Sequence, residues 1–96
     1  MQIRTLERTQ VYFDWAAIRD SHYSREEVLV NGALVQILTR LVGDGVIQLF
    51  VGVYTSEGKP IFEDFTSDVQ NMTMDQAIAW GLDRGRSVGN GQRPMP

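Results

Sequence analysis

The chain has 96 residues, of which 43% are hydrophobic and 22% are charged, proportions typical of a single globular domain with a modest core. It contains no cysteine, which excludes disulfides, thiolate metal sites and a cysteine nucleophile, and this fits a reducing compartment. The net charge is −3, and residues 44–75 hold six acidic residues against one lysine, a balance that opposes binding to nucleic-acid phosphates.

The N-terminal segment and the apolar stretches bear on where the protein resides. The first ten residues include charged side chains and no apolar run, which is unlike a signal peptide. The longest apolar stretches are far shorter than the roughly 20 residues of a membrane-spanning helix. We therefore expect a cytoplasmic protein without a membrane segment, in which residues 1–90 form one α+β domain and residues 91–96 a flexible tail.

Residues 9–15 alternate in polarity, with Val11, Phe13 and Trp15 on one side of an extended chain. A period of two, combined with aromatic and β-branched residues, predicts a strand. Residues 2–7 either extend this strand or form a separate short one.

Residues 24–42 have two interpretations. Ser24 and Glu27 are spaced as a capping box, and five apolar residues then share one helical face: Val30, Leu34, Ile37, Leu38 and Leu41. Against a helix, Asn31-Gly32 between valine-rich runs is a strong hairpin signal. We favour the helix because polar and apolar residues separate more cleanly on it. A hairpin would make the middle of the protein a β-meander.

The second half of the chain is easier to interpret. Residues 46–54 are almost continuously apolar, which is typical of a central strand, and residues 60–65 alternate, which predicts a second strand joined to the first by a turn. Thr73 is a candidate N-cap with Gln76 in capping-box register, so we predict a helix that continues to about residue 88.

These elements predict an α+β fold of order β-α-β-β-α. We expect a two-layer sandwich in which both helices lie on one face of an antiparallel or mixed sheet. The alternative, which follows from the hairpin interpretation, is a β-meander with a single C-terminal helix.

The predicted sheet suggests a binding surface. If both helices cover one face, Phe50 and Tyr54 lie on the open face, where Tyr12 and Phe62 can join them. Exposed aromatic clusters often bind partners, so our leading hypothesis is a non-catalytic protein-interaction or self-association module, with a homodimer as one form. The alternative is that the N-terminal segment or the C-terminal tail covers these aromatic side chains.

The last predicted helix carries Ala77, Gly81 and Gly85 at intervals of four, so small residues line one side of it. Such a stripe allows another backbone to approach closely. The simpler interpretation is that this helix packs tightly on the sheet or on the first helix. The second is a close helix–helix contact between two copies of the chain, and the third is fraying of the helix near Gly85, with Gly89 as a late stop.

A second hypothesis is a nucleic-acid-binding accessory protein that uses C-terminal arginines. Arg84, Arg86 and Arg93 would contact phosphates, and Arg84 and Arg86 are the candidate anion contacts. The glycines near them follow the helix, whereas phosphate loops place glycines before a helix, where the positive dipole end faces the anion.

A third hypothesis is a small-ligand binder or an enzyme with Asp14, Trp15 and His22 near a pocket. His22 is the only histidine and no nucleophile motif accompanies it, so we expect no catalytic residues, no metal and no cofactor. His22 is more simply interpreted as an exposed loop residue.

Overall fold

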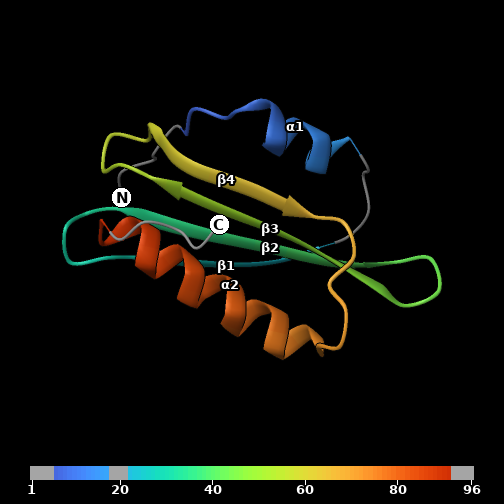
Figure 1. The fold of residues 1–96 in the computed structure, drawn as a ribbon. Helices are drawn as coiled ribbons and strands as arrows, with labels where there is room; N and C mark the ends of the chain where they lie inside the picture. Colours follow the sequence, from blue (N-terminus) through green and yellow to red (C-terminus); the bar gives the residue numbers. More distant parts are fainter. Residues whose placement is uncertain (1–5, 18–21, 92–96) are drawn as a thin grey trace.

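The computed structural model describes residues 6–17 and 22–91, and within them four strands form one antiparallel sheet with a helix on each face (Figure 1). The strands lie in the order β1-β2-β3-β4, so each pairs with its neighbour in sequence. The elements are α1 (Gln10–Ala16), β1 (Tyr23–Val28), β2 (Leu34–Val42), β3 (Val46–Tyr54), β4 (Pro60–Thr66) and α2 (Met74–Gly89). The predicted α+β class, with an antiparallel sheet and two helices, is confirmed.

The strand predicted over residues 9–15 is wrong, because this segment forms α1. Thr9 is the N-cap, and its Oγ1 accepts a hydrogen bond from the Val11 amide at 3.2 Å. The apolar residues that alternate along the chain also recur at helical spacing, and those that pack on the sheet are Val11, Tyr12, Trp15 and Ala16. A short strand was also predicted over residues 2–7. Residues 6–9 precede the helix without strand structure, and residues 2–5 lie outside the described residues.

The helix predicted over residues 24–42 is also wrong, and the meander interpretation is correct for this region. β1 and β2 pair antiparallel and are joined by a turn at Asn31-Gly32. Gly32 has φ +89°, a conformation that suits glycine in a turn. The Asn31 side chain accepts from the Ala33 amide at 3.0 Å and donates to the Gly89 carbonyl at 2.8 Å, which ties the turn to α2.

The elements predicted in the second half are confirmed. β3 matches residues 46–54, and β4 extends the second predicted strand by one residue. At the start of α2 the Thr73 Oγ1 accepts from the Gln76 amide at 3.2 Å, while Gln76 Oε1 accepts from the Thr73 amide at 2.9 Å. This capping box satisfies two backbone amides that a helix end otherwise leaves unpaired.

The two helices lie on opposite faces of the sheet, which corrects the expectation of both on one face (Figure 1). The α2 face carries the larger apolar cluster, which comprises Val35, Ile37, Leu49, Val51, Val53, Leu82 and Val88. The α1 face carries Trp15, Leu38 and Phe50. The reason is local: the N-terminal segment folds as a helix and covers the face that a strand would have left open. Neither α1 nor α2 is long and apolar enough to span a membrane.

Candidate functional site

The aromatic residues predicted to bind a partner do not form one exposed surface. Phe50 and Tyr54 lie on the α1 face and are 0% exposed, so the covered alternative is observed. Tyr12 of α1 packs edge-on against Phe50, with 5.5 Å between ring centroids. Phe62 lies on the opposite face, against the α2 cluster. The buried pair is therefore unavailable to a partner while α1 is in place.

A polar network fills the α1 face beside these rings. Arg8 Nη1 donates to Gln36 Oε1 at 2.7 Å and to the Tyr54 hydroxyl at 2.8 Å. Tyr54 in turn donates to Glu63, whose other oxygen accepts from the Thr9 amide at 2.9 Å. Burial and the bond to Glu63 raise the pKa of the Tyr54 hydroxyl well above its ordinary value. The network joins the segment before α1 to three strands and gives these groups a structural role.

Trp15 and His22, which the third hypothesis placed near a pocket, lie together without Asp14. Their rings are 6.2 Å apart in a T-shaped arrangement, while Asp14 accepts from Gln10 within α1. Trp15 also contacts Arg40, which is 1% exposed and whose guanidinium carbon lies 3.8 Å from the indole centroid. A guanidinium over an indole face is stabilised by the ring quadrupole, so Trp15 serves to hold a buried cation.

The two described arginines predicted to contact anions both interact within the chain. Arg86 makes a bidentate ion pair with Glu27, with both nitrogen–oxygen distances at 2.7 Å. Arg84 lies over the rings of Phe62 and Trp80, at 5.3 and 5.5 Å from their centroids. The hydrogen bond to Arg86 lowers the pKa of Glu27 below its ordinary value. Arg93, the third predicted phosphate contact, lies outside the described residues.

The small-residue stripe of α2 faces the sheet. Ala77, Gly81 and Gly85 are buried. A Cβ added at Gly81 would lie 3.2 Å from Ile37 Cδ1, and one at Gly85 would overlap Val35 Cγ1. The close approach in this structure is therefore between helix and sheet within one chain.

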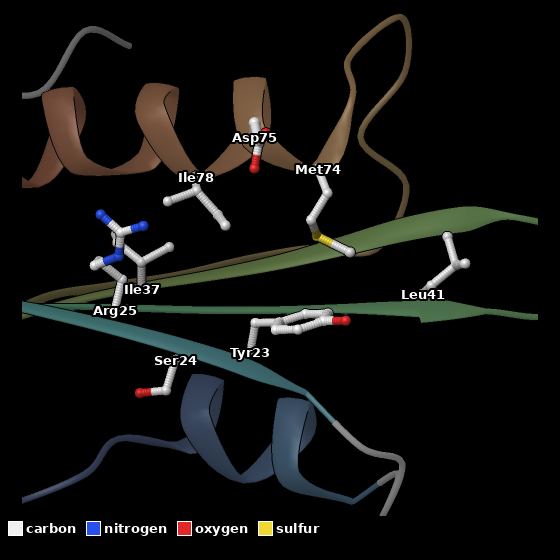
Figure 2. A pocket seen from close by; sticks show the side chains of 8 residues that line it. All are labelled: Tyr23, Ser24, Arg25, Ile37, Leu41, Met74, Asp75 and Ile78. Carbon is white, nitrogen blue, oxygen red and sulfur yellow. The ribbon is translucent and has the colours of Figure 1, made fainter.

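A cavity of about 560 Å³ lies between the first half of α2 and the strands β1 and β2 (Figure 2). Figure 2 shows Met74 and Ile78 reaching down from the helix toward Ile37 and Tyr23 on the strands, while Ser24 points to the other side of the sheet. Its lining consists of Tyr23, Ser24, Arg25, Ile37, Leu41, Met74, Asp75 and Ile78. The cavity has an apolar floor with one cationic and one anionic side chain at its rim.

The cavity opens beside an edge of the sheet, because β1 pairs only with β2 among the described strands. The Leu29 amide donates to the Ala33 carbonyl at 2.8 Å, which fixes the direction of the backbone groups along β1. Since these groups alternate, those of Ser24, Glu26 and Val28 point away from β2. β1 therefore offers a row of outward amides and carbonyls next to an apolar cavity.

Sequence reasoning missed this site because the segment that forms β1 was assigned to a helix. Tyr23 and Leu41 are 69% and 59% exposed, large values for apolar side chains, yet neither was a candidate. The Asn31-Gly32 turn was the signal that leads to them, because a hairpin there makes β1 a strand at the edge of the sheet. Comparison of the chain with family models, with curated proteins and with solved structures finds no match, so its function has to be inferred from these residues.

Proposed function

We propose that the chain is a non-catalytic protein-interaction module that binds an extended polypeptide segment along β1. The observation that supports this most directly is the position of the apolar cavity beside the outward backbone groups of β1. Strand addition uses such a pairing of features, because main-chain hydrogen bonds give affinity and a neighbouring pocket selects side chains.

The dimensions of the site suit a strand. Ser24, Glu26 and Val28 offer outward groups at every second residue, which matches the spacing of hydrogen-bonded positions on a partner strand. Alternate side chains of that strand would face the α2 side, where Ile37 of β2 and Ile78 of α2 line the cavity from opposite sides. One buried aliphatic or aromatic side chain there contributes about 1.5–3 kcal/mol to binding.

The non-catalytic part of the proposal is supported by the roles of the titratable groups on the opposite face. Glu63 accepts hydrogen bonds from the Thr9 amide, the Thr9 hydroxyl and Tyr54. These bonds dock the N-terminal segment on the sheet. A carboxylate held in this way stabilises packing.

Selection of linear peptides from a random displayed library tests the proposal. The immobilised chain should enrich peptides that bind in solution, and Leu41→Glu should weaken them because it places a charge at the cavity. Glu26→Pro should also weaken them, because it removes an outward amide without touching the ladder to β2. Ile61→Glu is the matched control, since Ile61 is 48% exposed on the other edge strand, β4.

The two outcomes are distinct. Peptides that no longer bind Leu41→Glu and Glu26→Pro but still bind the Ile61→Glu control support the proposal. The proposal would be overturned if no peptide is enriched, or if the enriched peptides bind Leu41→Glu and Glu26→Pro as tightly as they bind the wild type.

A further inference from the structure

We infer that the segment bound by β1 is β1 of a second copy of this chain, paired antiparallel about a two-fold axis at Glu26. This rests on the proposed function, since it requires β1 to accept a strand. Two four-stranded sheets would then join into one continuous sheet with both α2 helices on the same side.

The charges along β1 select this register. Three side chains of β1 lie on the α2 face: Tyr23, Arg25 and Glu27. They pair with the β2 residues Thr39, Ile37 and Val35, and Ile37 and Val35 belong to the α2 cluster. An axis at Glu26 places Arg25 of each copy directly opposite Glu27 of the other, so the favourable pair occurs twice. An axis one residue earlier would place Arg25 opposite its own copy, and one residue later would oppose two Glu27 side chains.

The backbone geometry agrees with this register. Because the groups of Glu26 point outward, the two Glu26 residues would exchange backbone hydrogen bonds across the axis. Arg25 and Glu27 would then form the intervening pair, whose Cα atoms lie about 4.5 Å apart and whose side chains are closest. Arg25 makes no ion pair with another described residue, so its charge is available for this contact.

Two features of the site bear on its charge balance. Glu27 already holds Arg86 of its own chain, and a second arginine at its exposed side would extend that pair into a triad. The Glu26 carboxylate accepts from its own Gln36 at 2.9 Å, which turns it toward its own sheet. Two Glu26 side chains nevertheless face each other at the axis, so Glu26→Gln should tighten association.

Single cysteines test the register directly, because the natural chain contains none. Glu26→Cys should form a disulfide-linked dimer on mild oxidation, since the Cα atoms of such a pair are about 5.5 Å apart. Ser24→Cys and Val28→Cys should each form no disulfide cross-link on their own, because each cysteine is about 14 Å from its own symmetry mate. A mixture of those two variants should cross-link. Ile61→Cys, on the other edge of the sheet, is the control.

Light scattering of the wild-type chain at increasing concentration gives the strength of association. Arg25→Glu should weaken dimerisation on the order of thirtyfold, because two favourable pairs become repulsive. The triple variant Arg25→Glu, Glu27→Arg and Arg86→Glu reverses every charge in the triad and should restore the dimer.

The outcomes separate this inference from the proposed function. A dimer that cross-links at Glu26→Cys and is broken by Arg25→Glu supports both. A chain that stays monomeric at millimolar concentration, or that cross-links equally at Ser24→Cys alone, overturns the inference. The proposed function survives that result if selected peptides still bind beside β1, and fails with it if they do not.

Discussion

Replacing Gly85 by alanine tests how closely α2 is held against the sheet. A Cβ at this position would overlap Cγ1 of Val35, which is 0% exposed at the centre of the α2 cluster. Valine has a stiff χ1 in a strand, so its methyl group cannot turn away without displacing its neighbours. The substitution therefore has to move either the helix or β2.

The net effect is the difference between two quantities. Overpacking a core costs typically about 1–3 kcal/mol, and the severity of this overlap places Gly85→Ala near the upper value. Alanine gains about 1 kcal/mol in helix propensity over glycine. We expect a loss of about 2 kcal/mol in the free energy of unfolding, which lowers the urea midpoint by about 1.3 M for a slope near 1.5 kcal/mol/M.

Gly81→Ala is the matched control, because its new Cβ would contact Ile37, Val51 and Leu49 at 3.2–3.4 Å. Those contacts are the ends of side chains, which can shift by a few tenths of an ångström. The propensity gain should then offset most of the cost, so urea unfolding followed by far-UV circular dichroism should show little change. A Gly85→Ala variant as stable as the wild type would refute the close packing of helix and sheet.

Three further changes probe other contacts. Because the pKa of Tyr54 is raised in the folded state, its contribution to stability is fully present below about pH 10, where the tyrosine of the unfolded chain ionises, and is lost as the pH rises further. Tyr54→Phe should therefore reduce the alkaline decline in the free energy of unfolding by about 1.4 kcal/mol per pH unit, as measured by urea titrations. The lowered pKa of Glu27 makes its contribution present at neutral pH and lost in acid, so the stability gap between Glu27→Gln and the wild type should close as pH falls through that pKa. Thr73→Ala removes the α2 cap and should cost about 1 kcal/mol, seen as a thermal midpoint lower by about 5 °C.

The sequence predicted the second half of the fold well because its signals agree with one another. Thr73 and Gln76 form the predicted capping box, and residues 46–54 form the predicted strand. In these segments the local propensity, the hydrophobic pattern and the capping and turn residues all favour one structure.

The first half was mispredicted because its patterns fit two structures at once. Val11 and Trp15 satisfy a period of two and also lie four apart, as a helix requires. The segment that forms β1 and β2 has apolar residues on one helical face, yet Gly32 adopts a positive φ that interrupts any helix. The burial of β2 on both faces of the sheet favours the strand over the helix. This burial depends on the rest of the fold, so the local sequence pattern does not reveal it.

The predicted site failed for the same reason. Phe50 and Tyr54 were placed on an open face by assigning both helices to the other one, and α1 covers them instead. The open edge of β1 was not predicted, because most of its residues were assigned to a helix over residues 24–42. The small-residue stripe could be recognised from the sequence because it depends on the spacing of Ala77, Gly81 and Gly85 within α2 alone, and all three are buried there.

The cavity beside β1 and the glycines of α2 lie at different points along the same helix. Met74 and Ile78 line the cavity in the first half of α2, whereas Gly81 and Gly85 lie close to β2 and β3 farther along the helix, near the buried Leu82 and Val88. A Cβ at either glycine would meet side chains of the sheet, so the missing side chains let this part of α2 pack closely on β2 and β3. The cost of glycine in the interior of α2 is thus offset by the close packing of the helix on the sheet.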